Sequence, residues 1–185
     1  MTSPEVMMRR SIVEVAGPIR QLPHTNDMEM WLRMAAHADI AYIHGADQAW
    51  HRDHEASMSE REVDDLLDLR ERAEAFEVLF GESELPVPST RYLHGLAKIT
   101  LANHAILSAS HEIDCGRSDK VSAYLEFAGT LVESPQELQG WPGLERRRKK
   151  ARSRSTSVVM ANFRRLHRRI KSELRWHRWR RTGVF

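Results

Sequence analysis

Apolar residues recur at helical spacing along most of the chain, and only the short stretch 11–15 favours a strand. The clearest segment opens with a capping-box pattern at Ser59 and Glu62. The apolar positions that follow are three and four residues apart: Leu66, Leu69, Ala73, Phe76 and Phe80. This spacing predicts a helix with one core-facing side, which ends near Gly81.

Three further segments show the same periodicity, and they cover residues 26–54, 89–110 and 118–132. The first opens with a second capping-box pattern, Asn-Asp-Met-Glu. The segment 89–110 is apolar around most of its circumference, so we expect it to be the central and most buried helix. Cys115-Gly116 breaks the chain before the last of the three, and residues 134–137 predict a short helical turn after it.

These segments predict an all-α fold: a compact bundle of about four helices with an extended N-terminal segment and a basic C-terminal helical arm. The N-terminal segment contains three prolines, so we expect it to be extended or docked on the body, with at most a single helical turn. We divide the chain into an N-terminal extension, an acidic helical bundle, a hinge and an Arg-rich arm, over residues 1–25, 26–134, 135–144 and 145–185.

The charges are distributed very unevenly along the chain. The whole chain has 28 Lys and Arg against 26 Asp and Glu, a formal net charge of +2. Residues 1–144 hold 12 basic and 24 acidic residues, a net of −12, whereas residues 145–185 hold 16 basic and 2 acidic residues, a net of +14. This asymmetry predicts a polyanionic partner for the arm, with nucleic acid first, although the acidic body itself is an alternative partner.

The arm begins with seven basic residues among the nine positions 146–154. Charge repulsion and the lack of apolar residues predict a stretch that is solvated or poorly ordered when free. A final amphipathic helix is predicted from about Ser157. Its apolar stripe recurs at spacings of 4, 3, 4 and 4: Val159, Phe163, Leu166, Ile170 and Leu174. We expect this stripe to dock on the bundle, on another copy of the chain or on a partner helix.

Phosphate is the ligand that this composition suits best, because arginine stays charged and makes paired hydrogen bonds to phosphate oxygens. Trp176 and Trp179 lie among the arginines, where they are suited to stack on unpaired bases, to anchor the arm by packing or to insert at a lipid interface. The candidate nucleic-acid-binding residues are Arg146, Arg147, Arg148, Lys149, Lys150, Arg152, Arg154, Arg164, Arg165, Arg168, Arg169, Arg175, Trp176, Arg178, Trp179, Arg180 and Arg181. Contacts of this kind read the backbone and not the base sequence.

The ten histidines are the main argument for an enzyme. His37, His44 and His51 are spaced by seven, with Asp47 between the last two, and His104 and His111 repeat the spacing. Helical rise separates residues seven apart by about 10 Å, so His44 and His51 cannot bind one ion. Asp47 and His51 form only a two-ligand fragment, and we predict no metal and no cofactor.

Motifs of other catalytic classes are absent from the sequence, which has no Gly-rich phosphate loop, no nucleophile elbow and no His-Glu-x-x-His. Cys115 follows His111 by four residues, in the manner of a nucleophile and its base, but an incidental thiol is the simpler interpretation. We therefore predict no catalytic residue. The single cysteine excludes an internal disulfide.

No apolar run approaches the ~20 residues that a membrane span needs, and the N-terminus lacks the pattern of a secretory signal. We expect a chain without integral membrane association that is cytoplasmic, or part of a nucleoprotein or viral particle.

The leading hypothesis is a non-enzymatic nucleic-acid-binding accessory protein. Its arm would contact DNA or RNA, and its bundle would contact a protein partner, a homo-oligomer or a larger macromolecular assembly. The first alternative is a structural adaptor of an oligomeric or viral assembly, whose basic arm docks on acidic protein surfaces. The second alternative is a metal-dependent helical-bundle enzyme.

Overall fold

The structure is a computed structural model of the whole chain. It describes residues 6–43, 49, 65–82, 85–153, 170, 173–174, 176–178 and 181. Every regular element in these ranges is a helix, and none of the described residues forms a strand. The predicted all-α class is confirmed. Within the same residues, no helix combines the length and the apolar character that crossing a membrane requires.

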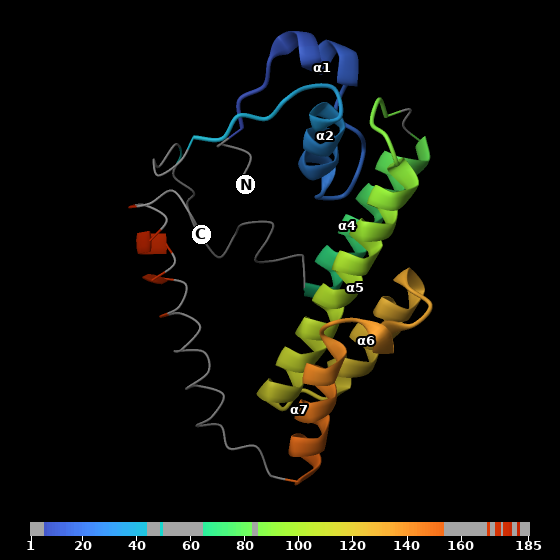
Figure 1. Cartoon of the computed structure of the whole chain (residues 1–185), viewed down its shortest axis with the longest axis vertical. Helices are drawn as coiled ribbons and strands as arrows, with labels where there is room; N and C mark the ends of the chain where they lie inside the picture. Colours follow the sequence, from blue (N-terminus) through green and yellow to red (C-terminus); the bar gives the residue numbers. More distant parts are fainter. Residues whose placement is uncertain are drawn as a thin grey trace.

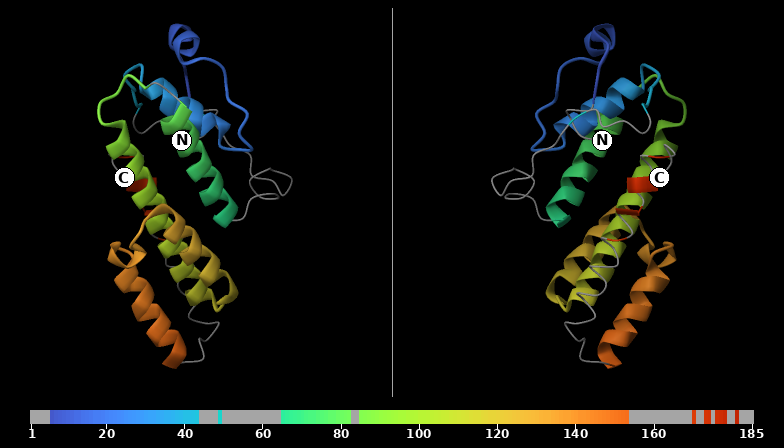
Figure 2. Two further views of the ribbon diagram at one scale, coloured as in Figure 1. Left: turned by 90° about the vertical axis from the view of Figure 1, so that its right-hand side faces the viewer. Right: turned by 90° about the vertical axis from the view of Figure 1, so that its left-hand side faces the viewer.

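One long helix, α5 (Thr90–Cys115), contacts three other helices of the body (Figure 1). Helix α4 (Asp65–Glu82) lies beside its N-terminal part in the antiparallel direction. Helices α6 (Asp119–Leu131) and α7 (Trp141–Ser153) lie beside its C-terminal half (Figure 2). The remaining helices, α1 (Arg10–Ala16) and α2 (Asn26–Ala35), lie together at the other end of the molecule.

The core lies between these helices and is built partly of small side chains. Ala102, Ala105 and Ala109 on α5, and Ala128 on α6, are completely buried. Residues without long side chains let neighbouring helix axes come close together. Larger side chains fill the space around them: Leu69, Leu101, Ile106, Ile113, Val121, Tyr124, Phe127 and Leu144.

Helix α5 agrees with the sequence prediction at its start and at its stop signal, but it is five residues longer than predicted. It ends at Cys115, and Gly116 takes the left-handed conformation (φ 77°) that glycine adopts without strain. The sequence predicts that this helix is the most buried one, and its eight buried residues are more than any other described helix contains. Its N-terminal half is nevertheless partly exposed. There, Tyr92 and Leu96 are among the exposed apolar residues.

The segments after α5 follow the sequence prediction closely. Ser118 precedes the first residue of α6, although its hydroxyl makes no capping hydrogen bond. The predicted short turn is the 3-10 helix η2 (Pro135–Glu137), with proline at its start. The predicted helix with the Leu66-to-Phe80 stripe is α4, in which Leu69 and Leu79 are buried, while its predicted cap at 59–62 lies outside the described residues.

Helix α2 is much shorter than predicted. It ends at Ala35, whereas the predicted helix extends to about residue 54. Its predicted capping box is also wrong. Glu29 does not turn back to cap the helix but is completely buried and pairs with Arg33 one turn later. Beyond the helix, Ile40 and Ile43 are exposed, so they supply none of the packing that sustains a helix in a protein.

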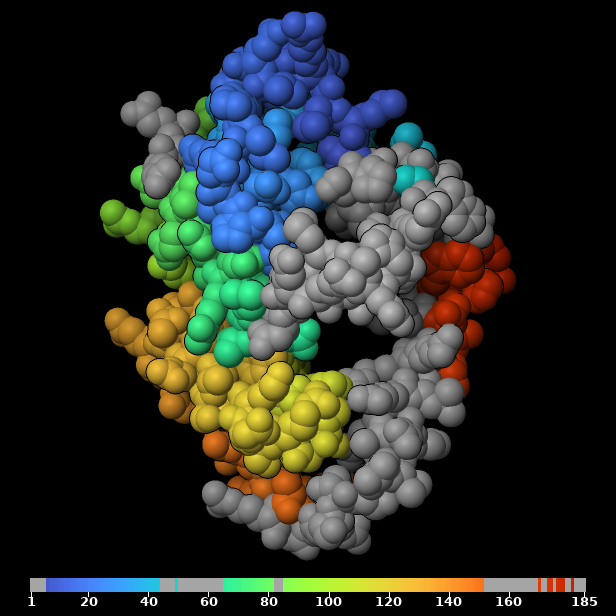
Figure 3. Space-filling model, turned by 180° about the vertical axis from the view of Figure 1, so that it is seen from behind, coloured from blue at the N-terminus to red at the C-terminus, as the bar shows by residue number. Residues whose placement is uncertain are grey.

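The N-terminal segment contains a seven-residue helix, α1, that includes the stretch 11–15. The strand tendency of that stretch is therefore overridden, and α1 is longer than a single turn. Figure 3 shows the N-terminal elements, in blue, covering one end of the molecule next to the green α4. The segment is docked on the body, which is one of the two arrangements that the sequence predicted.

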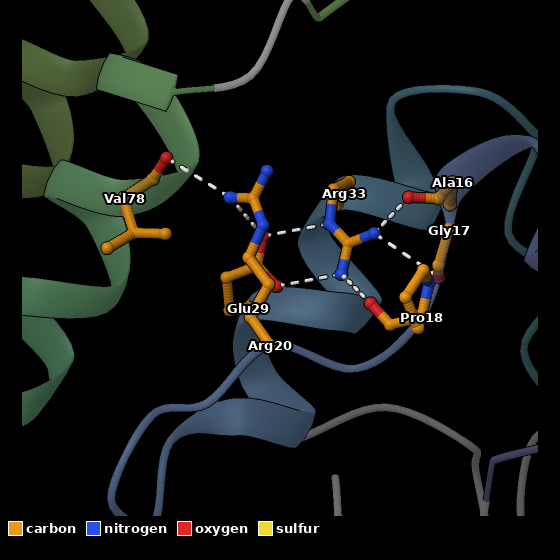
Figure 4. A network of polar contacts seen from close by, with 7 residues as sticks. All are labelled: Ala16, Gly17, Pro18, Arg20, Glu29, Arg33 and Val78. Atoms are coloured by element: carbon orange, nitrogen blue, oxygen red, sulfur yellow. Dashed lines mark hydrogen bonds and ion pairs between the residues drawn. The ribbon is translucent and has the colours of Figure 1, made fainter.

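The docking of the N-terminal segment on the body depends on the buried carboxylate of Glu29 (Figure 4). Arg33 donates to its two oxygens at 2.9 and 3.0 Å, and Arg20 adds a third contact at 3.1 Å. The same Arg33 guanidinium donates to the carbonyls of Ala16, Gly17 and Pro18. One side chain therefore neutralises a buried charge and holds the turn after α1.

Three further contacts attach this segment to α4. Arg20 donates to the carbonyl of Val78 at 3.2 Å, and the Thr25 hydroxyl donates to the carbonyl of Glu71 at 3.2 Å. His24 lies beside the carboxylate of Glu71. The N-terminal segment is thus linked to α4 through polar contacts at three successive places.

The predicted hinge is a folded part of the molecule. Residues 135–144 contain η2 and the first turn of α7, and Leu144 is fully buried in the core. The stretch that follows was expected to be solvated or poorly ordered when free. Positions 146, 147, 149 and 150 are exposed, and the stretch continues the same helix to Ser153. Tertiary packing explains why this stretch is helical. The apolar start of α7 packs on α5, and the basic residues continue α7 from there. The division of the chain into domains stays a prediction.

Replacing Arg33 by methionine should lower the free energy of unfolding by about 3 kcal/mol. The change leaves the buried Glu29 carboxylate with Arg20 as its remaining arginine partner, and it removes the donor of the Ala16 and Pro18 carbonyls. Urea unfolding followed by circular dichroism measures the difference.

The matched control is Arg10→Met, which removes an exposed ion pair with Glu14 on α1. Exposed pairs contribute little, so this variant should differ from the parent by less than about 0.5 kcal/mol. Equal losses in the two variants would contradict the role assigned to the Glu29 network.

Candidate nucleic-acid interface

The basic residues that begin the predicted arm lie on α7, directly after its buried anchor. Leu144 is completely buried, and Trp141 packs against the same core cluster. The positively charged positions 146–150 follow within the next two turns of the helix. The cations therefore extend from a helix whose first turn is fixed to the body.

The position of α7 is set by its close approach to α5. The Gly140 N–H donates to the side-chain oxygen of Asn103 at 3.3 Å. A Cβ at Gly140 would lie only 3.1 Å from a methyl carbon of Ile106, so a larger residue would push the two segments apart. Further along, Arg147 pairs with Asp114 at 3.2 Å. Residue numbers rise together along both helices, so α7 runs parallel to the C-terminal half of α5.

The five cations at 146–150 differ in their partners. Arg147 donates to Asp114 and to the carbonyl of Gly143, and Arg148 lies 3.5 Å from Glu145. Arg146, Lys149 and Lys150 are exposed and form no ion pair with any residue that the structure describes. These three cations keep their full charge available for an anionic ligand.

A second pair of charges lies at the same end of the molecule, where α5 turns into α6. Arg117 donates two hydrogen bonds, at 2.5 and 2.7 Å, to the carboxylate of Glu112, whose side chain is only 4 % exposed. These bonds lower the pKa of Glu112, and burial opposes the shift less strongly. The same contact raises the pKa of Arg117. Lys120 is exposed, and its charge also lowers the pKa of Glu112.

The structure brings only part of the predicted set together. Arg146, Arg147, Arg148, Lys149 and Lys150 lie on α7, and the backbone of Arg152 belongs to the same helix. Trp176, Arg178 and Arg181 are described and exposed, and the Trp176 ring meets the ring of His177 edge-on at 5.0 Å. Arg154, Arg164, Arg165, Arg168, Arg169, Arg175, Trp179 and Arg180 lie outside the described residues.

Two members of this region were not predicted from the sequence: Asp114 and Arg117. Arg117 binds Glu112 five residues earlier, whereas the role of Asp114 depends on the return of α7 along α5. No local pattern indicates that return. The one available signal is Leu144, an apolar residue two positions before a basic run.

The histidines that were considered as metal ligands do not come together among the described residues. His104 is exposed and His111 partly buried on α5, and His37 lies after the end of α2. His44, Asp47 and His51 lie outside the described residues. Across the described part of the chain, no group of three or more His, Cys, Asp or Glu side chains is placed to hold a metal ion.

Cys115 and His111 lie together, with the sulfur 3.6 Å from the Nε2 atom of the ring. The nearest carboxylate, Glu112, lies 3.7 Å from the other ring nitrogen, and both of its oxygens already accept hydrogen bonds from Arg117. The carboxylate is therefore committed to an ion pair and not to orienting the imidazole. This arrangement gives the thiol no catalytic triad.

No protein-family model, curated protein or solved structure matches this chain. The case for a function therefore depends on the chain's own residues.

Replacing Glu112 by glutamine should flatten the acid limb of the stability curve. A carboxyl whose pKa is lowered on folding stabilises the protein above its unfolded pKa, and this contribution is lost as the pH falls through the folded pKa. The parent should therefore lose stability between about pH 5 and 3 more steeply than the variant. Urea unfolding at a series of pH values measures this slope, and parallel curves would contradict the assignment.

Proposed function

We propose that this chain is a non-enzymatic nucleic-acid-binding accessory protein whose Arg-rich C-terminal region contacts the phosphate backbone. The observation that carries the proposal is a set of exposed cations on α7, Arg146, Lys149 and Lys150, that form no ion pair with any residue the structure describes. The helix that carries them is anchored by the buried Leu144. An anchored helix already holds its charges at fixed spacing. Binding a ligand therefore costs less side-chain and backbone conformational entropy.

The chemistry of the region favours phosphate over other anions. Guanidinium groups make bidentate hydrogen bonds to phosphate oxygens and remain charged at all accessible pH values. Neutralising phosphates releases condensed counterions, which drives binding with little dependence on base sequence. The exposed Trp176 supplies an aromatic face suited to stacking on an unpaired base, so single-stranded DNA or RNA is within the proposed partners.

The helical body would contact a protein partner or a second copy of the chain, and so link a nucleic acid to a larger assembly. In this proposal the body is a bundle built around α5 and the segment 145–185 is its basic arm. The proposed location is the cytoplasm or a nucleoprotein or viral particle.

A specific observation also supports the alternative of a structural adaptor. Three arginines of the basic end, Arg117, Arg147 and Arg148, already bind carboxylates of this chain. The same side chains are equally suited to carboxylates on an acidic protein surface. An adaptor would form a defined oligomer that survives nuclease treatment, whereas an accessory protein that depends on nucleic acid would lose its assembly.

Changing Arg146, Lys149 and Lys150 together to glutamine should weaken binding to duplex and single-stranded oligonucleotides of any sequence. Each lost phosphate contact should reduce the slope of log affinity against log salt by about 1. Fluorescence anisotropy with labelled strands between 50 and 300 mM salt measures both quantities.

The matched control for this triple variant removes three exposed cations at the opposite end of the molecule: Arg9, Arg10 and Arg91, also to glutamine. The two variants have the same net charge. If they weaken binding equally, overall charge and not α7 is responsible, and the proposal is wrong. Failure of the parent protein to bind either strand at low salt would also overturn it.

Replacing Asp114 by asparagine should tighten binding about two- to five-fold, because the change releases Arg147 and removes a carboxylate that repels phosphate. Glu126→Gln, on the exposed side of α6, makes the same change in net charge away from α7. Anisotropy at fixed salt compares the two variants. A gain that is the same in both would show that Arg147 is not part of the interface.

A further inference from the structure

The N-terminal half of α5 presents large apolar side chains to solvent. Helices α6 and α7 lie beside the C-terminal half of α5, whereas α4 runs beside its N-terminal half (Figures 1 and 2). Positions 92, 95, 96 and 99 have the spacing of one helix side, and we call them the exposed α5 face: Tyr92, Gly95, Leu96 and Ile99. Tyr92, Leu96 and Ile99 are 65, 41 and 42 % exposed. Single exposed apolar residues are normal, but a stripe on one side of a helix is typical of an interaction site.

Gly95 lies within this face, and no contact among the described residues requires a glycine there. Glycine inside a helix is less favourable than alanine, because it loses more backbone freedom on folding. A Cβ at Gly95 would meet nothing within 4 Å. Gly81 and Gly129 have equally open surroundings, but they lie within the last turn of α4 and α6, next to the point where each helix stops. Gly95 therefore suits a position at which another molecule approaches the backbone of α5 closely.

We propose that the exposed α5 face is where a second copy of this chain docks, with the two α5 helices crossing antiparallel at Gly95. The inference rests on the part of the proposed function in which the body meets a second copy, and it needs no nucleic acid. A two-fold pair brings the same patch of both copies into contact. Gly95 of one copy then faces Gly95 of the other, so that the two helices come close together. Tyr92, Leu96 and Ile99 pack around the crossing.

An antiparallel crossing also suits the shape of the body. Helices α6 and α7 lie beside the C-terminal half of α5, so in an antiparallel pair those of the two copies are at opposite ends of the contact. A parallel pair would place them side by side, where they would compete for the same space. The antiparallel arrangement therefore leaves the exposed α5 face of each copy accessible to the other.

The distribution of charge allows two copies of an acidic body to meet at this face. Residues 1–144 hold 12 basic and 24 acidic residues, a net of −12, so two copies repel each other where carboxylates are exposed. Helix α5 has no Asp or Glu before Glu112, and Glu77 on the neighbouring α4 pairs with Lys98 at 2.8 Å. The exposed Arg91 side chains of the two copies would be on opposite sides of the crossing, about 12 Å apart along the axes, which exceeds the Debye length at physiological salt.

The size of the face predicts a weak and reversible dimer. Three large side chains, each 41–65 % exposed, offer less than the roughly 800 Å² per partner of a standard stable interface. Small interfaces belong to transient associations, so we expect a dissociation constant of about 10 µM. A permanent complex with an unlike protein would require a larger apolar surface than this face provides.

Sedimentation equilibrium of the full chain, freed of nucleic acid by nuclease, tests the proposal. The parent should change from monomer to dimer as its concentration rises from about 1 to 100 µM. Gly95→Gln should raise the dissociation constant by roughly tenfold or more, because the new side chain fills the crossing point but meets nothing within one chain. Gly129→Gln, at an equally open position of α6, is the matched control and should leave the dimer unchanged. Circular dichroism should show that both variants keep the helical fold.

Cysteine cross-linking gives a second measurement on the same pair of positions. In the full chain with Cys115→Ser, Gly95→Cys should form a disulfide-linked dimer roughly tenfold faster than Gly129→Cys, because only the first position faces its own copy. Helix axes about 8–10 Å apart place two facing Cα atoms within about 6 Å of each other, a separation that a disulfide spans. Non-reducing gel electrophoresis follows the reaction.

A parent that stays monomeric up to about 100 µM would overturn the proposal, and so would equal effects of the changes at Gly95 and Gly129 in both assays. A dimer that nuclease removes would also contradict it, because nucleic acid would then hold the copies together. Changing Arg146, Lys149 and Lys150 together to glutamine should leave this dimer intact. Loss of the dimer in that variant would assign the contact to α7, as the adaptor alternative requires, and not to α5.

Discussion

The close packing of α4, α6 and α7 on α5 is the constraint on which the described body depends. Ala102, Ala105 and Ala109 form a completely buried row on α5, and Ala128 faces it from α6. Small residues in this row allow neighbouring helices to approach while Ile106 and Leu144 fill the remaining space. Helix α5 depends on this packing for its stability, because its buried apolar face would be exposed to water if the helix were alone. Since α7 supplies part of that packing, the fold of the body and the position of α7 are determined together.

Charged residues serve different purposes at the two ends of this body. At the end formed by α1 and α2, Glu29 and Arg33 are buried and fully engaged, so their charges hold the N-terminal segment and are not available to a ligand. At the opposite end, Arg146, Lys149 and Lys150 stay exposed while carboxylates occupy the arginines nearest to α5. This contrast supports the proposal that the second end meets a polyanion.

Much of the fold is predictable because local sequence determines it. The stop of α5 at Gly116, the start of α6 after Ser118 and the turn at 135–137 each depend on residues within one turn of the boundary. Glycine and proline act through their own backbone preferences, so their effect is visible in the sequence. The charge pattern likewise identifies the basic stretch that begins at Arg146.

Other features depend on packing that no local pattern indicates. Glu29 has the spacing of a capping residue, but it is buried and binds Arg33 one turn later and Arg20 from the preceding segment. Residues 141–143 have the composition of a hinge, and in the structure they form the first turn of α7, because Leu144 reaches the core. For the same reason the contact between Arg147 and Asp114 is invisible in the sequence, because it requires the packing of α7 on α5.

The central claim of this account is that nucleic acid contacts the end of the molecule where α7 presents its cations. The chain has five lysines, at positions 98, 120, 149, 150 and 171, so acetylation by a small reagent reports on a few well-separated places. Mass spectrometry should show Lys149 and Lys150 protected by a saturating oligonucleotide, and Lys98, which pairs with Glu77 on α4, unchanged. Protection of Lys98 without protection of Lys149 and Lys150 would contradict the account.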